Sequence, residues 1–342
     1  FVQSKIYRTV YIQATMLPCE RKIENEELSE LVKRTLTSPV IDEYLLFGPE
    51  STCLPSYYGS GADAVGNFQI RNGDVIVASF PKSGTTWLQE MVWLLKNHLD
   101  YDAAQVEIYK RFAKLELPGI GDPNQPSRDN SVEELNRLSG PRLIKTHLPY
   151  SLLPRRTRDG SEIPKIIYIM RNPKDAFISY YHFGRAALGW RASKEELAKL
   201  FMGGTILYGP YWKSALGYWN LRHSPNVLIL KYEEMVKDLR AVIRRTCEFL
   251  EREPLTHEQM EKLCGHLSFN SMKDNSAVNY STMLSQRKNF AVNPAPFMRC
   301  GKVGQYRWEM SSQMIAEFDE WIERSIEGTD FSKKYACFGK DD

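Results

Sequence analysis

From about residue 74 onward, short runs of aliphatic and β-branched residues alternate with longer stretches of helical periodicity. This alternation is typical of βαβ units, in which helices join parallel strands. The short runs are bounded by turn residues and predict buried strands at 74–80, 142–146, 165–170 and 226–231. The longer stretches predict helices at 85–98, 173–188, 208–223, 234–250, 256–264 and 311–327. We therefore expect an α/β fold, with a mainly parallel central sheet flanked by helices on both faces.

Two long stretches, 117–140 and 278–304, contain Pro and Gly and show no clear periodicity. Loops of this length in a compact domain are usually lids, binding loops or disordered segments. No internal repeat or shift in composition divides the chain. We expect one domain at 21–335, an N-terminal extension at 1–20 whose disorder is left open, and a C-terminal tail at 336–342.

Composition narrows the classes of function. Of the 342 residues, 42% are hydrophobic and 25% charged, as in ordinary globular proteins. The net charge of +3 is too small to favour nucleic acid, so a bound anion must be held locally. No apolar run approaches the ~20 residues that span a bilayer, and no signal peptide is visible. We therefore expect no membrane partner. The six cysteines lack the spacing of metal ligands, so we expect reduced thiols and a cytoplasmic location.

The most informative segment is Ser79-Phe80-Pro81-Lys82-Ser83-Gly84-Thr85-Thr86-Trp87, where a strand enters a turn that opens a helix. Backbone N–H groups at a helix N-terminus, together with Lys82 and neighbouring hydroxyls, form a site for phosphate or sulfate. Lys82 precedes Gly84, and the Walker pattern G-x-x-x-x-G-K-[ST] is absent, which weakens a kinase interpretation. A capped turn without a ligand is the alternative.

Two further segments follow predicted strands. In Lys145-Thr146-His147-Leu148-Pro149, a histidine that can take a proton near neutral pH shares one face with a lysine. In the segment from Arg171 to Ser179, an arginine fork and a hydroxyl two helical turns later can face one anion. The alternatives are a structural histidine and an ordinary arginine cap with a surface serine.

In this order and spacing, PKSGTTW, KTHLP and RNPKD resemble the cytosolic sulfotransferases. LKYEEM at 230–235 and FMRCGKVG at 297–304 extend the resemblance over about residues 73–329. It implies a P-loop-like site for the donor 3'-phosphoadenosine 5'-phosphosulfate (PAPS), which leaves as PAP after transfer of its sulfuryl group. The implied acceptor is a small hydrophobic molecule bearing a hydroxyl, such as a phenol, catechol or steroid. We expect no metal, because a sulfuryl group carries less negative charge than a phosphoryl group.

The resemblance assigns a role to each matching residue. His147 resembles the general base, Lys82 the cation on the leaving phosphate and Lys145 a second cation on the transferring group, while Ser179 completes the implied catalytic set. The implied donor contacts are Lys82, Ser83, Gly84, Thr85, Thr86, Trp87, Arg171, Ser179, Tyr232, Leu267, Ser268, Phe269, Met272, Phe297, Met298, Arg299, Cys300 and Gly301. The implied acceptor contacts are Lys145, His147, Tyr109, Phe112 and Phe183, and Trp190 lies in a segment of the same kind. A place in the core is the alternative for most of these aromatic residues.

Three features depart from the family's pattern. The late loop reads Arg299-Cys300-Gly301 where Arg-Lys-Gly is usual, so one 3'-phosphate cation is moved to Lys302 or lost. Leu267 replaces a frequent Thr, which removes a hydroxyl and predicts weaker donor binding. The family's dimer segment is degenerate at 307–316, which leaves a homodimer open.

Four hypotheses follow. An active small-molecule sulfotransferase leads, and a nucleotide-binding relative with little or no turnover is suggested by Cys300 and Leu267. A nucleotide kinase lacks its Walker lysine, and a Golgi carbohydrate sulfotransferase would be expected to carry a membrane anchor. Sulfation followed by elimination stays open.

Overall fold

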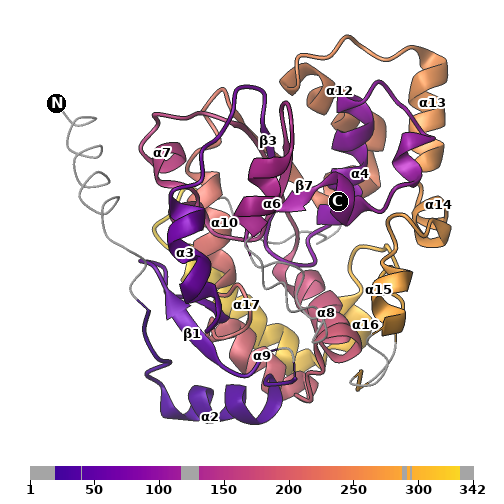
Figure 1. The fold of residues 1–342 in the computed structure, drawn as a ribbon. Coiled ribbons are helices and arrows are strands. Elements are labelled where there is room, and N and C mark those ends of the chain that lie inside the picture. Colours follow the sequence, from indigo (N-terminus) through magenta and orange to yellow (C-terminus); the bar gives the residue numbers. More distant parts are fainter. Residues whose placement is uncertain (1–19, 40, 117–130, 287–290, 293–294, 332–342) are drawn as a thin grey trace.

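A five-stranded parallel sheet forms the centre of the computed structural model (Figure 1), which describes residues 20–39, 41–116, 131–286, 291–292 and 295–331. Its strand order is β4-β5-β3-β6-β7. The bounds are β3 (Val75–Ser79), β4 (Ala113–Lys114), β5 (Leu143–Thr146), β6 (Lys165–Met170) and β7 (Val227–Lys231). The four predicted strands are confirmed, whereas β4, only two residues long, was not predicted.

The sheet order explains why the three sequence motifs meet. β3 pairs with β5 on one side and with β6 on the other, all in parallel. The carboxyl ends of these strands therefore lie side by side at one edge of the sheet, where α/β folds bind ligands. The segments that begin at Phe80, His147 and Arg171 leave the sheet at this edge.

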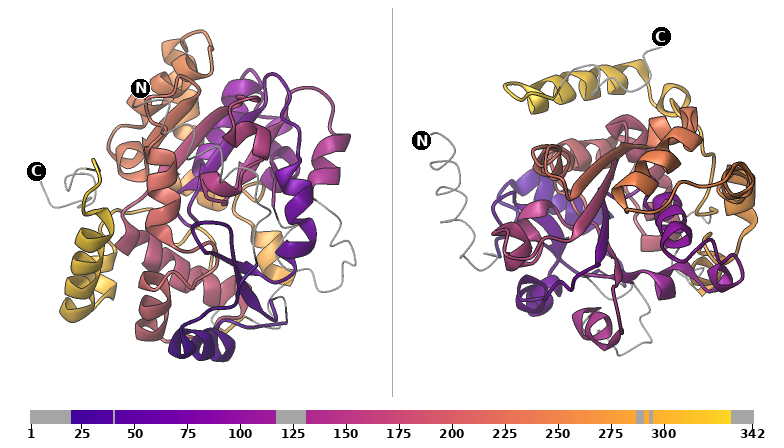
Figure 2. Two further views of the ribbon diagram at one scale, coloured as in Figure 1. Left: turned by 90° about the vertical axis from the view of Figure 1, so that its left-hand side faces the viewer. Right: turned by 90° about the horizontal axis from the view of Figure 1, so that it is seen from above.

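Helices cover both faces of the sheet, as predicted (Figures 1 and 2). Along β3, Ile76 and Ala78 enter one core while Val75 and Val77 enter the other. This alternation follows the two-residue period of a strand and explains why the sheet strands read as continuous apolar runs. Within the described residues, no helix combines the length and the apolarity that crossing a membrane requires.

Most predicted helices are confirmed within a few residues. The described α-helices are α2 (Glu26–Thr35), α3 (Tyr58–Gly66), α4 (Thr85–Lys96), α5 (Ile108–Arg111), α6 (Ser131–Arg137), α7 (Arg155–Arg158), α8 (Pro173–Phe183), α9 (Lys194–Met202), α10 (Tyr211–Trp219), α11 (Tyr232–Lys237), α12 (Leu239–Phe249), α13 (His257–His266), α14 (Phe269–Asp274), α15 (Ser281–Gln286), α16 (Tyr306–Glu309) and α17 (Ser312–Ile326). Short 3₁₀ turns lie at Ala103–Gln105 and Tyr150–Leu152. Side-chain caps fix several starts, including Thr256 for α13 and Ser311 for α17.

Several elements differ from the sequence-based expectation. The predicted helix 234–250 is divided, because the Asp238 carboxylate accepts from the Ala241 N–H and begins α12 as a separate helix. The predicted helix 173–188 continues beyond α8 as a π-helical segment, Gly184–Leu188. The two aperiodic stretches contain α6 and α15, while 117–130 lies outside the described residues.

A short antiparallel hairpin, β1 (Tyr44–Phe47) with β2 (Thr52–Pro55), precedes the main sheet and was not predicted. It joins the core on the α8 side through residues such as Phe47 and Leu54. The described structure from residue 20 onward therefore packs against the same domain that carries the three motifs.

Candidate active site

The turn between β3 and α4 has the geometry of an anion-binding loop. Gly84 adopts a left-handed conformation, with φ of 100°, directly before the first residue of α4. A Cβ at Gly84 would lie 2.7 Å from Cδ2 of Tyr232, so both conformation and space require glycine. The N-terminus of this 12-residue helix presents its unsatisfied N–H groups and its positive dipole end at the turn.

His147 follows β5 and is oriented by the end of β3. Its Nδ1 lies 2.9 Å from the carbonyl oxygen of Ser79. Because a carbonyl oxygen only accepts, Nδ1 carries the proton and Nε2 keeps a free lone pair. Burial lowers the pKa of His147 well below its usual value, and the positive charge of Lys145 lowers it further. The imidazole is therefore neutral at neutral pH and suited to accept a proton.

A buried carboxylate holds the backbone beneath His147. Glu116 is completely buried, and its Oε1 accepts from the His147 backbone N–H at 2.9 Å and from the Tyr208 hydroxyl at 3.1 Å. Its Oε2 accepts from the Thr146 hydroxyl at 2.7 Å. This network fixes the chain that carries the histidine.

Lys82 and Lys145 line the same cavity as the histidine. The ammonium of Lys82 lies 3.8 Å from the ring centroid of Phe297 and 4.4 Å from that of Phe183. Burial lowers the pKa of Lys82 to about 7, with further contributions from Lys145 and Arg171. Burial also lowers the pKa of Lys145 to about 8. A bound anion would raise both pKa values, because it stabilises the charged ammonium groups.

Arg171 extends this positive surface from the end of β6. It is only 8% exposed, and its guanidinium donates to the Lys82 carbonyl oxygen at 3.1 Å while lying over the Tyr232 ring. Its Nε has no hydrogen-bond partner among the described residues. A buried donor of this kind favours a bound acceptor such as a phosphate oxygen.

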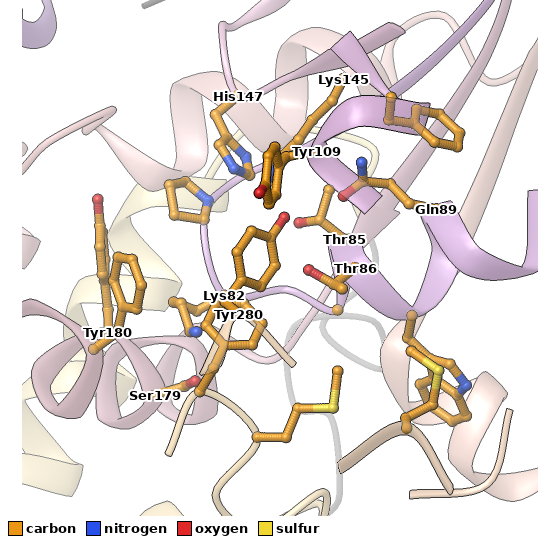
Figure 3. Close-up of a pocket in the computed structure, with 18 of the residues that line it drawn as sticks. Lys82, Thr85, Thr86, Gln89, Tyr109, Lys145, His147, Ser179, Tyr180 and Tyr280 are labelled. Carbon is orange, nitrogen blue, oxygen red and sulfur yellow. The ribbon is translucent and has the colours of Figure 1, made fainter. Parts of the chain in front are cut away.

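These groups face one cavity of about 1420 Å³, shown in Figure 3. In that view His147 and Lys145 approach from one side, Lys82 and Ser179 from another, and Thr85, Thr86 and Gln89 from α4. A base, several cations and a helix N-terminus thus surround a single space. This arrangement suits transfer of an anionic group to a hydroxyl.

The sequence model of the family described as "Sulfotransferase domain" matches residues 72–330. The chain belongs to the sulfotransferase family. The luciferin sulfotransferase of Photinus pyralis is 44% identical over 340 residues, covering 95% of this chain and 92% of the relative. Human Sulfotransferase 1E1 is 33% identical over 267 residues, covering 77% of this chain and 87% of the relative.

Solved structures agree with this assignment. Retinol dehydratase in complex with androsterone and inactive cofactor PAP superposes with a TM-score of 0.83 at 29% identity, covering 92% of this chain and 99% of that one. Mouse sulfotransferase SULT7A1 complexed with PAP gives a TM-score of 0.66 at 26% identity, covering 83% and 95%. The comparisons confirm the family, the fold class and the assignment as a sulfotransferase enzyme.

The sulfotransferase cavity collects almost every residue that the sequence assigned to the donor or the acceptor. One exception is Ser83, which is fully buried and absent from the lining. The other is Trp190, whose expected place in the acceptor cleft is wrong. Trp190 is 1% exposed in the core beside Gly184, and its indole N–H donates to the Tyr44 hydroxyl at 3.2 Å.

The residues expected around the donor base and the 3'-phosphate also meet here. The Trp87 indole donates to the Leu267 carbonyl oxygen at 2.8 Å, which ties α4 to the segment before α14. Gly301 has a φ of 70°, and a Cβ there would lie 2.2 Å from Cδ2 of Phe269. Arg299 forms an ion pair of 2.8 Å with Glu309. Cys300 and Lys302 line the same part of the cavity.

Several lining residues were not predicted from the sequence. Gln89 is completely buried on α4, and neither atom of its amide has a hydrogen-bond partner among the described residues. Its position one helical turn after Thr85 was the signal that could have found it. Lys114, Tyr208 and Tyr280 also line the cavity, together with Glu116 just behind it. They come from three distant parts of the chain, so no contiguous sequence motif indicated them.

In the part of the chain that the structure describes, no three His, Cys, Asp or Glu side chains are grouped to hold a metal ion. The degenerate segment 307–316 contributes parts of α16 and α17, and the expectation about dimerisation stays a prediction. The same holds for the domain limits and the cytoplasmic location.

Proposed function

We propose that this sulfotransferase moves the sulfuryl group of PAPS to the hydroxyl of a small hydrophobic acceptor, with His147 as the general base. The observation that carries the proposal is the contact of 2.9 Å between Nδ1 of His147 and the Ser79 carbonyl oxygen, which implies the tautomer of His147. The Ser79 carbonyl holds the proton on Nδ1, so the lone pair of Nε2 is available in the cavity that Lys82 and Lys145 also line.

The donor site of the proposal begins at the N-terminus of α4. N–H groups of the turn at 82–87 bind the 5'-phosphosulfate, and Arg171 with Ser179 binds the 3'-phosphate. Trp87, Tyr232 and the 267–272 segment surround the adenine. The solved relatives that contain PAP support this assignment. Arg299 joins the 3'-phosphate contacts, so its pair with Glu309 competes with the phosphate for this guanidinium.

In the reaction, His147 accepts the proton of the acceptor hydroxyl while the acceptor oxygen forms a bond to sulfur. The bond between sulfur and the phosphate oxygen breaks, and the phosphate leaves with an additional negative charge. Lys82 donates to that leaving oxygen, and Lys145 contacts the oxygens of the sulfuryl group. Because side-chain cations neutralise the charge, the proposal includes no metal.

The acceptor occupies the part of the cavity beyond His147. The aromatic and aliphatic residues that line the cavity include Tyr57, Phe183, Leu188, Leu207 and Tyr208. Flat apolar walls of this kind favour a ring system, and a phenol best matches a base that must remove a proton near neutral pH. Luciferin, named for the relative from Photinus pyralis, is the first acceptor to test.

The test is transfer of labelled sulfate from PAPS to a panel of luciferin, simple phenols, hydroxysteroids and retinol. Wild-type protein should label at least one acceptor, and His147→Ala should reduce turnover by at least ~100-fold, because a general base contributes that much or more. His223→Ala, at an exposed histidine outside the cavity, is the matched control and should keep full activity.

Binding of PAP should persist in His147→Ala and is measured as thermal stabilisation. If wild-type protein binds PAP but labels no acceptor, the nucleotide-binding alternative with little turnover replaces this proposal. If His147→Ala retains full turnover, the base is another group.

A further inference from the structure

One residue of the RNPKD segment has no role in the proposed reaction. Asp175 lies in the first turn of α8 and is only 1% exposed. A buried carboxylate is unfavourable unless hydrogen bonds or opposite charges compensate it. Asp175 also lines the cavity, where the proposed donor brings further negative charge. The fold therefore keeps a carboxylate at a place where it must be bonded to other groups.

Both oxygens of the Asp175 carboxylate bind the chain at the end of the late loop. Oδ2 accepts from the Gly304 N–H at 2.7 Å, and Oδ1 accepts from the Tyr306 N–H at 3.1 Å. Both bonds are buried, and they join positions 129 and 131 residues apart in the sequence. Hydrogen bonds to an ionised group are roughly twice as strong as neutral ones. Asp175 therefore ties the end of the late loop to the start of α8.

The late loop carries groups that the proposed function places on the 3'-phosphate. Arg299 and Gly301 precede the tied residue, Gly304, by only a few positions. The Arg171 guanidinium donates to the Lys302 carbonyl oxygen at 3.4 Å, so the loop runs directly beside the other proposed phosphate ligand. A shift of the tied end would move Arg299 and Gly301 relative to Arg171.

The spacing of residues along α8 supports the same role for Asp175. Asp175, Ser179 and His182 are four and three residues apart, and they therefore share one face of the helix. Ser179 lines the cavity (Figure 3). Nε2 of His182 lies 2.5 Å from Oε2 of Glu309, which also pairs with Arg299 at 2.8 Å. One helix face thus holds the end of the loop, a proposed phosphate ligand and the carboxylate partner of Arg299.

We propose that Asp175 is a positioning residue that makes the donor site selective for a nucleotide with a 3'-phosphate. It holds the late loop at the distance from α8 at which Arg299 and Gly301 reach the 3'-phosphate beside Arg171. Because an arginine fork binds phosphate only in a suitable geometry, a small displacement of the loop lowers the affinity for this phosphate in particular. The inference rests on the proposed function and adds a determinant of donor choice to it.

The test compares two nucleotides that differ only in the 3'-phosphate, PAP and adenosine 5'-phosphate. Calorimetry on wild-type protein should show at least ~100-fold tighter binding of PAP, because the 3'-phosphate adds two or more charged hydrogen bonds. Asp175→Asn should weaken PAP binding by about tenfold and leave adenosine 5'-phosphate within about threefold, because the amide nitrogen cannot accept from a second N–H. Removal of a negative charge beside a phosphate would by itself strengthen PAP binding, so the direction of the change identifies positioning.

A double-mutant cycle with Arg299→Ala tests whether Asp175 acts through the loop. In the Arg299→Ala background, Asp175→Asn should weaken PAP binding by less than about threefold, because the main group that Asp175 positions is absent. A purely structural role would weaken both nucleotides alike and would leave the two substitutions additive, and either result would overturn the proposal. Asp238→Asn removes another carboxylate that accepts a backbone N–H, outside the cavity lining; it is the control and should keep the ratio of affinities.

Gly304→Ala is the second variant and decides the question if Asp175→Asn does not fold. It keeps Asp175 but disfavours the φ of 78° at residue 304, so the N–H turns away from the carboxylate. The preference for PAP over adenosine 5'-phosphate should fall by about threefold or more. Gly328→Ala, at a φ of 70° outside the cavity lining, is the matched control and should leave the preference unchanged.

The wild-type measurement separates this inference from the proposed function. Equal affinity of wild-type protein for the two nucleotides would contradict the proposed 3'-phosphate site, and the role of Asp175 with it. A wild-type preference for PAP that neither Asp175→Asn nor Gly304→Ala reduces would overturn the role of Asp175 alone and leave the donor site in place.

Discussion

The proposed donor end and the proposed acceptor end of the cavity are built in different ways. The donor end comes from contiguous segments that leave three adjacent parallel strands, and its main features are backbone N–H groups, a helix N-terminus and Arg171. The acceptor end is assembled from single side chains on separate elements, such as Lys114 on β4 and Tyr208 before α10. In the proposed function, anion binding therefore depends on local geometry, whereas acceptor choice depends on long-range packing.

Among the changes that test this difference between the two ends, Arg171→Ala should have the largest effect, which is a loss of PAP affinity. If Arg171 binds the 3'-phosphate as proposed, removing this buried guanidinium should weaken PAP binding by about 100-fold, because charged hydrogen bonds in buried sites cost most to lose. The change should hardly affect acceptor KM once donor is saturating. Calorimetry with PAP measures the effect, and Arg222→Ala, remote from the cavity, is the control. Unchanged PAP affinity would remove Arg171 from the donor site.

Glu116→Gln should lower kcat and leave the proposed donor end intact. The amide keeps the shape but loses the charge that raises the pKa of Lys145, so kcat should fall about tenfold while PAP binding persists. The decline of activity at high pH should also begin at a lower pH, because Lys145 would lose its proton more easily. A lower kcat with an unshifted pH profile would show that Glu116 only supports the fold.

In the wild-type protein, the pH dependence of PAP affinity tests the proposed donor end separately from the proposed acceptor end. The free pKa values of Lys82 and Lys145 are about 7 and about 8, and a bound anion raises them. Donor binding therefore takes up protons, and PAP affinity should fall by about tenfold as the pH rises through these values. Calorimetry in buffers of different ionisation enthalpy measures the protons. Affinity that is constant across this range would contradict the depressed pKa values.

The acidic side of the pH profile of kcat depends on His147. Because burial holds the pKa of His147 well below its usual value, kcat should stay near its plateau as the pH falls through the ordinary histidine pKa and should fall only in more acidic solution. A fall in kcat centred near the ordinary histidine pKa would place the base in a more solvated environment than the Ser79 contact indicates.

The smallest effect is expected for Gln89→Met. The amide of Gln89 has no hydrogen-bond partner among the described residues, so its removal should leave the free energy of unfolding unchanged or raise it by about 1 kcal/mol. The KM of a ligand that bonds this amide should rise by about threefold. Thermal melting and steady-state kinetics measure the two effects, with Gln313→Met on the surface of α17 as control. A marked loss of stability would show that Gln89 has a structural role.

The difference between contiguous segments and single side chains on separate elements also explains what the sequence could predict. Strand, turn and helix signals around Gly84, His147 and Arg171 are local, so they predicted the sheet edge and an anion site there, whereas the rest of the expected donor lining came from the resemblance to the sulfotransferases. Glu116 was missed because it follows a two-residue strand, β4, that is too short to show periodicity. Trp190 was misplaced because sequence cannot tell which side of α8 an aromatic residue packs on, and Gly184 admits it to the core.

A single-turnover measurement tests the central claim most directly. Wild-type protein and His147→Ala, each saturated with labelled PAPS, are mixed with the best acceptor of the panel, and the labelled product is followed in time. The account predicts a chemical step at least ~100-fold slower in His147→Ala, with PAP affinity unchanged. Equal rates, or loss of PAP binding together with the rate, would contradict the division of this cavity into a donor end and an acceptor end with His147 as base.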